Sequence, residues 1–109
     1  MPISIHQPDF IPWVGYFEKI RLSKKFYILD DVQLSRRGWT HRDKLIINNI
    51  EKWITIPIKK KGNYDSLIKD IEIDNDIQWK KKHLSSIKMS YGKAQNFAFI
   101  FEIINDIYN

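Results

Sequence analysis

The sequence predicts an α/β fold with a Rossmann-like, three-layer start in the order strand, loop, helix, strand, followed by an antiparallel hairpin and two C-terminal helices. Three observations predict it. Apolar runs at residues 3–5 and 26–29 enclose a stretch whose large side chains recur at helical spacing. Two further apolar runs are separated by the turn-forming pair Asn48 and Asn49. From residue 77 onward the apolar residues again recur at helical spacing.

The first element is a short buried strand over residues 3–5, which ends beside His6. Residues 7–13 form a loop, because Pro8 and Pro12 restrict the residues before them and have no amide hydrogen to donate. The two prolines therefore stiffen the connection between the strand and the helix that follows.

That helix is predicted over residues 14–22. Trp13, Phe17 and Ile20 fall on one of its faces at spacings of four and three. This spacing favours a core position for Trp13 and Phe17 over a role in stacking on a ligand.

Residues 26–29 form the second strand, and parallel pairing with the first strand requires a right-handed crossover. Residues 31–38 form a polar loop. The predicted hairpin pairs residues 44–47 with residues 53–58, which places Pro57 at a sheet edge or a strand end.

A loop with lysine and glycine follows at residues 59–65. Ile71 and Ile73 alternate with acidic residues, as in a short, half-exposed strand. A helix is predicted over residues 77–91, and Gly92 ends it.

The last predicted helix, residues 97–108, has apolar side chains on nearly every side. Such a helix must be buried all round, and a domain of 109 residues is too small to cover it. Two explanations fit: the helix forms a homo-oligomer interface, or it packs against a C-terminal half that this chain lacks.

Composition restricts the class of protein. The net charge of +5 comes largely from the lysine runs at 59–61 and 80–82, and only four of the 18 basic residues are arginines. Because no nucleic-acid motif accompanies them, we interpret these lysines as solvated surface and expect no nucleic-acid partner. The chain has no cysteine, no apolar run long enough to span a membrane and no signal peptide, so we expect a cytoplasmic protein.

The loop after the first strand is the strongest candidate site. Open α/β sheets bind ligands where a strand ends before a helix, and the free amides of that helix favour an anion. His6 can serve there as a general acid or base, or donate to a developing oxyanion, with Gln7 beside it. The alternative, that His6 only hydrogen-bonds its own loop, stays open.

Two more groups follow the second strand. Asp30 and Asp31 could bind a cation, or one of them could act as a base. Arg36, Arg37 and Arg42 lie within seven positions, which suggests a loop that binds phosphate or carboxylate. A zinc site would need His6, His41 and an aspartate, but their spacing matches no known pattern, so no metal is predicted. We expect His83 to be a packed helix residue.

Several stretches, in order and with similar gaps, resemble the WbqC-like protein family. They are "IHQPDFIPWVGYFEKI", "FYILDDVQLSRRGW", "HRDK", "KWITIPIKK", Trp79 with His83, and "SYGKAQNF". The first two are long and specific. One departure is His41-Arg42-Asp43, where the family has a stretch like Asn-Arg-Asn. Because family members are usually about twice this length, the resemblance implies that residues 1–109 are a single α/β domain at the N-terminal end of a longer protein.

The resemblance also implies an activity. Members of the family occur in bacterial gene clusters for O-antigen and other surface polysaccharides, and transfer of an amino-acyl or other acyl group to a sugar is a suggested role. The implied substrate is a small molecule, a nucleotide-sugar or an activated acyl donor, and the resemblance leaves the cofactor open. The implied catalytic residues are His6, Gln7, Asp30 and Asp31. The implied substrate-binding residues are Pro8, Trp13, Gly15, Tyr16, Gln33, Arg37, Gly38, Trp39 and Arg42.

Two other functions remain open. The chain could be a non-catalytic module that holds a nucleotide-sugar or a partner subunit, or an inactive truncated fragment. Replacing His6 by alanine would separate catalysis from binding.

Overall fold

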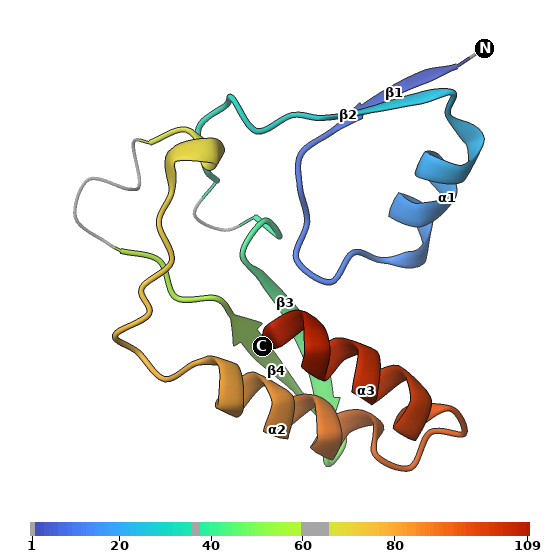
Figure 1. Ribbon diagram of the computed structural model, residues 1–109, viewed down its shortest axis with the longest axis vertical. Coiled ribbons are helices and arrows are strands. Elements are labelled where there is room, and N and C mark those ends of the chain that lie inside the picture. Colours follow the sequence, from blue (N-terminus) through green and yellow to red (C-terminus); the bar gives the residue numbers. More distant parts are fainter. Residues whose placement is uncertain (1, 36–37, 60–65) are drawn as a thin grey trace. The chain divides into compact units, whose positions relative to one another are not determined.

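The computed structural model describes residues 2–35, 38–59 and 66–109. The chain opens with strand β1 (Ile3–His6), helix α1 (Val14–Leu22) and strand β2 (Lys25–Ile28), as Figure 1 shows. β1 and β2 pair in parallel, with Ile3 opposite Lys25 and His6 opposite Ile28. The predicted strand–loop–helix–strand order is therefore confirmed, and the predicted bounds of α1 match those of the structure.

The predicted hairpin is also confirmed. Strands β3 (Arg42–Ile47) and β4 (Ile50–Thr55) form a separate two-stranded sheet. Asn48 and Asn49 connect them with φ angles of 52° and 63°. Two consecutive positive φ angles are typical of a type I′ turn, which joins antiparallel strands, and asparagine tolerates this conformation better than most residues.

The second strand of this hairpin was predicted over residues 53–58, three residues too late. The turn has only two residues, so β4 begins directly after it, at Ile50. Pro57 consequently lies beyond the strand. The predicted strand around Ile71 and Ile73 is wrong: a 3₁₀ turn, η1 (Ile68–Asp70), precedes Ile71, and Ile73 makes one isolated antiparallel bridge with Ile58.

Helices α2 (Lys80–Tyr91) and α3 (Phe97–Tyr108) end the chain. α2 begins three residues later than predicted, because residues 75–77 form a turn and bend, and the Trp79 indole nitrogen donates to Asn75 Oδ1 at 3.1 Å. Gly92 follows its last turn as expected, with its amide donating to the Lys88 carbonyl. The bounds of α3 agree with the prediction.

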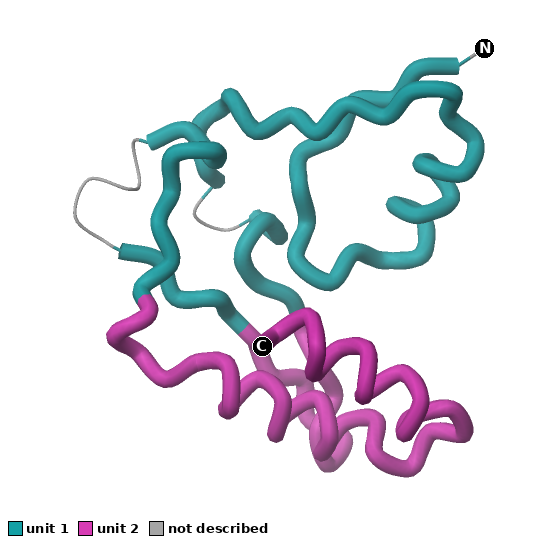
Figure 2. Tube along the Cα trace, in the orientation of Figure 1, with its two compact units in different colours: residues 1–43, 55–74 teal, residues 44–54, 75–109 magenta. Residues whose placement is uncertain are grey.

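The chain divides into two compact units, shown in different colours in Figure 2. Unit 1 comprises residues 1–43 and 55–74, and unit 2 comprises residues 44–54 and 75–109. In unit 1 the buried apolar side chains are Tyr16 and Leu34. In unit 2 they are Leu45, Ile47, Ile54 and Ile87. Buried apolar side chains therefore occur among the described residues of both units.

The predicted burial of the first elements is wrong. Ile3 and Ile5 are 61% and 56% exposed, and Trp13 and Phe17 are 68% and 55% exposed. Tyr16 is the buried residue of α1, and its ring meets that of Phe26 on β2 at 5.4 Å. Helical spacing identified the helix, but it did not identify the face that packs against the strands.

None of the described helices combines the length and apolar character needed to cross a membrane.

Candidate functional site

The site is built on the loop that leaves β1. His6, the last residue of that strand, is half-buried, and its ring meets the Tyr16 ring edge-on at 4.9 Å. His6 Nδ1 lies 2.7 Å from the Gln7 carbonyl oxygen. A carbonyl oxygen can only accept a hydrogen bond, so Nδ1 carries the hydrogen. In the neutral imidazole Nε2 then holds the lone pair, which is the form that accepts a proton.

The start of α1 brings an indole against the backbone. A Cβ atom at Gly15 would collide with the Trp13 ring, so only glycine leaves room for the indole at this position. The Tyr16 amide donates to the Trp13 carbonyl at 3.0 Å, which closes the turn into the helix. Gly15 therefore allows Trp13 to lie over the helix start.

A second loop of unit 1 is attached to the first. The Phe10 amide donates to the Trp39 carbonyl at 3.0 Å. Gly38 shapes this second loop: its amide donates to the Ser35 carbonyl at 3.1 Å, and its own carbonyl accepts from Arg42 Nε at 3.1 Å. The backbone bond between Phe10 and Trp39 holds together two loops that lie almost thirty positions apart in sequence.

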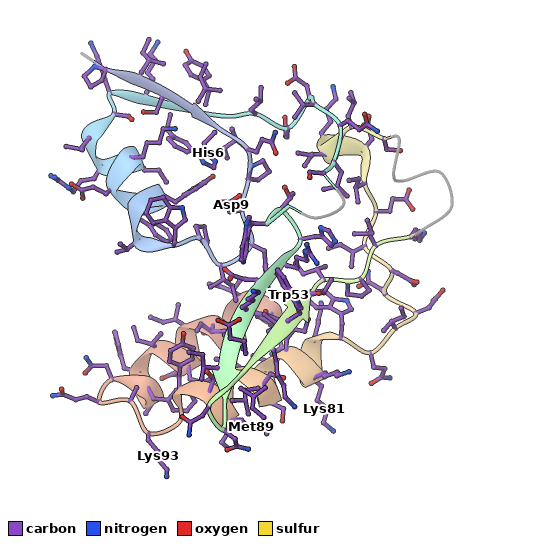
Figure 3. All side chains as sticks on the ribbon, turned by 180° about the vertical axis from the view of Figure 1, so that it is seen from behind. His6, Asp9, Trp53, Lys81, Met89 and Lys93 are labelled. Atoms are coloured by element: carbon purple, nitrogen blue, oxygen red, sulfur yellow. The ribbon has the colours of Figure 1, made fainter. Side chains whose placement is uncertain are left out.

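A cavity of about 280 Å³ lies where these loops meet. This volume is close to the lower end of the range for small-molecule pockets. Three aromatic rings, one proline and two carboxyl groups line it: Phe10, Trp13, Trp39, Pro12, Asp9 and Asp43. Figure 3 labels His6, at the end of β1, and Asp9, on the loop that follows it.

The electrostatics of this cavity centre on Asp9. Burial raises the pKa of the Asp9 carboxyl and is the largest influence; the His6 charge lowers this pKa and the Asp43 charge raises it. Burial and the Asp9 charge also raise the pKa of the Tyr16 hydroxyl. Asp9 is therefore coupled to a histidine, a second carboxylate and a phenol. This combination of groups can accept, hold and return a proton.

His41 lies beside this site in the sequence. Its Nδ1 is buried, and no described residue offers it a hydrogen bond. Burial, and then the charge of Arg42, lower the pKa of the imidazole, so its neutral form is favoured. Among the residues that the structure describes, no cluster of three or more His, Asp or Glu side chains is arranged to hold a metal ion.

The structure brings together only some of the predicted site residues. Trp13 and Trp39 line the cavity, and Gly15 and Gly38 shape its two loops. His6 and Tyr16 do not line the cavity, but they contact each other and interact with Asp9, which does. Arg42 contributes its bond to Gly38.

The remaining predicted residues lie elsewhere. Gln7 and Pro8 are half-buried in the first loop without lining the cavity. Asp30 and Asp31 follow β2 and also do not line it; the Asp30 carbonyl accepts from the Lys69 amide at 2.8 Å. Gln33 forms an isolated bridge with Leu67. Arg37, like Arg36, lies outside the described residues.

Sequence reasoning missed Asp9, Phe10 and Asp43. Asp9 and Phe10 stand inside the first family-like stretch, between its two prolines, and Asp43 stands in "HRDK". The one feature of the sequence that could have indicated them is that each stretch places an acidic residue next to an aromatic or basic one. Only the contact between the two loops shows that these acids share one cavity.

Comparison with known proteins agrees with the resemblance of these stretches. A sequence profile of the WbqC-like protein family matches residues 7–109. The chain is 34% identical over 106 residues to "Uncharacterized protein Rv1507c" of Mycobacterium tuberculosis (strain ATCC 25618 / H37Rv). That match covers 97% of this chain and 46% of the relative, so the chain spans about half the length of the curated relative it matches. No solved structure matches the chain significantly.

Proposed function

The chain belongs to the WbqC-like protein family, and we propose that it provides the active site of a transferase that moves an amino-acyl or other acyl group to a sugar during the synthesis of bacterial surface polysaccharide. The observation that carries this proposal is the Asp9 carboxyl, placed at an aromatic cavity and coupled to His6 and Asp43. Acyl transfer needs a proton acceptor at the nucleophile, and this group of residues supplies one.

In the proposed reaction, the nitrogen of a sugar amine attacks the carbonyl carbon of an activated acyl donor. A C–N bond forms while the bond from the carbonyl carbon to the leaving group breaks, and the leaving group departs with that electron pair. His6 Nε2 accepts the proton released by the nitrogen and returns it to the leaving group. The negative charge of Asp9 stabilises the imidazolium formed in between.

The walls of the cavity suit a sugar. Trp13 and Trp39 line it while remaining 68% and 47% exposed. Such flat, partly exposed rings present apolar surface to the C–H face of a sugar, and the carboxylates accept hydrogen bonds from its hydroxyl or amino groups. The acceptor sugar therefore occupies the cavity, and Asp43 helps to orient it.

The donor is proposed to lie at the start of α1 and beside Arg42. Trp13, which precedes α1, makes no side-chain capping bond to this helix, and the Tyr16 amide donates to the Trp13 carbonyl, so an anionic group would meet the remaining amides of the first turn. Arg42 adds a guanidinium next to Asp43 in the sequence. The predicted substrate-binding roles of Gln33 and Arg37, and the catalytic roles of Gln7, Asp30 and Asp31, remain proposals.

A non-catalytic module that binds a nucleotide-sugar is the second candidate. The exposure of Trp13 and Trp39 favours it, because aromatic side chains at a cavity rim serve binding as well as catalysis. In that case the acidic groups select the ligand and move no proton.

The test is a transfer assay with this chain and, in parallel, with the full-length mycobacterial relative. Each is incubated with activated acyl donors and amino-sugar nucleotides, and the N-acylated product is detected by mass spectrometry. We expect His6→Ala to lower the rate by about 10²- to 10⁴-fold while ligand binding, measured by calorimetry, persists. Equal rates for His6→Ala and wild type would contradict the catalytic proposal, and binding without turnover in both proteins would establish the binding module.

Further proposals follow from family membership. We propose that residues 1–109 form the N-terminal α/β portion of a longer protein with a Rossmann-like start, and that the protein acts in the cytoplasm. If only the full-length relative is active in the assay, this chain is an inactive part of such an enzyme.

A further inference from the structure

Helix α3 carries an apolar surface that the described residues leave uncovered. Phe99, Ile103 and Ile107 recur at every fourth residue and are 69%, 47% and 76% exposed, and Ile100 beside them is 45% exposed. These four residues are called the outer face of α3. Residues spaced by four lie above one another on a helix, so the outer face is a continuous stripe of about two turns.

The opposite face of α3 is already engaged within unit 2. Phe97, Phe101 and Ile104 are half-buried on that face, whereas the outer face is exposed. Tyr108 lies 3.1 Å from Nδ1 of His83, a residue that is only 4% exposed on α2. The helix therefore cannot rotate to bury its outer face without breaking these contacts. A helix that is apolar on both faces requires a second partner.

The charges of α3 indicate what kind of partner fits. Glu102 and Asp106 are exposed on this helix, which contains no lysine or arginine. A second copy of α3, docked antiparallel along the same stripe, would bring the carboxylates of both copies to the same side of the contact. Like charges at such close quarters weaken association. A helix with lysine or arginine beside its apolar stripe would instead pair with both acids.

The length of the mycobacterial relative points to a source for such a helix. This chain aligns over 97% of itself but over only 46% of that relative, so about half of the longer protein lies outside the shared segment. We propose that the outer face of α3 binds an amphipathic helix with basic flanks, supplied by the half of longer family members that this chain does not match. This proposal concerns unit 2 and does not depend on the proposed transferase activity.

The experiment uses the unmatched half of the mycobacterial relative as the probe. That half is expressed alone, its folding is checked by circular dichroism, and it is titrated into this chain while sedimentation velocity follows the complex. We expect a 1:1 complex at micromolar concentration. Replacing Phe99 and Ile107 together by serine should weaken it at least tenfold, because the stripe loses its two most exposed side chains.

Two further variants distinguish docking on the outer face of α3 from non-specific hydrophobic association. Met89→Ser removes an apolar side chain that is 63% exposed on α2, labelled in Figure 3, and should leave the complex unchanged. Glu102→Lys with Asp106→Lys should weaken the complex at low salt and have a smaller effect at high salt.

The proposal is overturned by any of three results. They are no complex between two folded partners, a complex that the serine variants leave intact, and self-association of this chain that depends on Phe99 and Ile107. The last result would identify a second copy as the occupant. Failure of the transfer assay has no bearing on this measurement, because the readout is mass and not turnover.

Discussion

Each unit contains a histidine in contact with a tyrosine and a tryptophan close by in the sequence, yet the surroundings are opposite. In unit 1, His6 meets the Tyr16 ring, and Trp13 stands at the rim of the nearby cavity, 68% exposed. In unit 2, His83 contacts Trp79 and Tyr108, with ring centroids 5.2 and 5.8 Å from its own. His6 is half-buried, whereas His83 is only 4% exposed.

The hydrogen-bond partners of the two histidines also differ: one is adjacent in the sequence and the other is distant. His6 donates from Nδ1 to the adjacent Gln7 carbonyl, and its charge acts on the carboxyl of Asp9. His83 Nδ1 is hydrogen-bonded to the hydroxyl of Tyr108, which lies on helix α3, 25 positions away in sequence. The first histidine is connected to a cavity and the second connects two helices. Residue type alone therefore does not identify a functional histidine; burial and partners do.

The largest expected effect is that of His83→Ala on stability. This substitution empties a buried position between α2 and α3 and removes the bond to Tyr108. We expect it to lower the free energy of unfolding by about 2–3 kcal/mol, which corresponds to a drop of roughly 10 °C or more in Tm for a chain of this size. Urea denaturation followed by circular dichroism measures it.

His6→Ala is the matched control for that experiment. Because His6 is half-buried at a loop, its removal should change the free energy of unfolding by less than about 1 kcal/mol. If His6→Ala destabilises as much as His83→Ala, the distinction between a site histidine and a packing histidine is wrong.

The second effect compares the two tyrosine hydroxyls. The Tyr108 hydroxyl, like that of any tyrosine, is protonated at neutral pH, and burial raises its pKa further, to about 12; it therefore remains available to His83. Tyr108→Phe removes that hydrogen bond and should cost about 1 kcal/mol. Tyr16→Phe should cost less than half as much, because no hydrogen bond within the described residues involves the Tyr16 hydroxyl.

Thermal melts of both phenylalanine variants at one pH check this order. Equal losses would mean that the Tyr108–His83 bond contributes nothing beyond ring packing. A larger loss for Tyr16→Phe would place the more important hydroxyl in unit 1 and reverse the comparison.

Elements set by neighbouring residues could be predicted from the sequence. Helix α1 and helix α3 have the predicted bounds, because both follow the periodicity of their own side chains and Pro12 precedes the start of α1. The turn at Asn48 and Asn49 was predictable because asparagine tolerates positive φ. His83 was correctly expected to be a packed residue, from its position on a helix four residues after Trp79.

Features that depend on distant contacts could not be predicted. The spacing predicted that Trp13 lies in the core. Burial in this region depends on contact with Phe26 of strand β2, and Tyr16, not Trp13, makes that contact. The cavity depends on the bond from Phe10 to Trp39, which joins two loops that no periodicity relates. Nothing in the sequence alone therefore indicates that Asp9 and Asp43 line one cavity.

The smallest expected effect is that of replacing Asp9 on the free energy of unfolding. It tests whether the charged Asp9 carboxylate at the cavity destabilises the folded chain. Its pKa is raised above the usual value, first by burial and then by Asp43, with His6 opposing. Near and just above the usual carboxyl pKa, the folded chain therefore binds more protons at this site than the unfolded chain does. Stability consequently falls as the pH rises through this window, and the penalty is fully present at neutral pH.

Asp9→Asn removes this charge and its penalty. At pH 7 the variant should be slightly more stable than wild type, by less than about 1 kcal/mol because water screens the site, and the difference should disappear below about pH 3. Thermal melts between pH 3 and pH 7 measure it, with the exposed Asp106→Asn as control. If Asp9→Asn is less stable than wild type at pH 7, the carboxylate stabilises the loop and is not a strained site residue. If Asp9→Asn raises the stability and abolishes acyl transfer, the Asp9 carboxylate of unit 1 lowers the stability of the fold and is required for the activity.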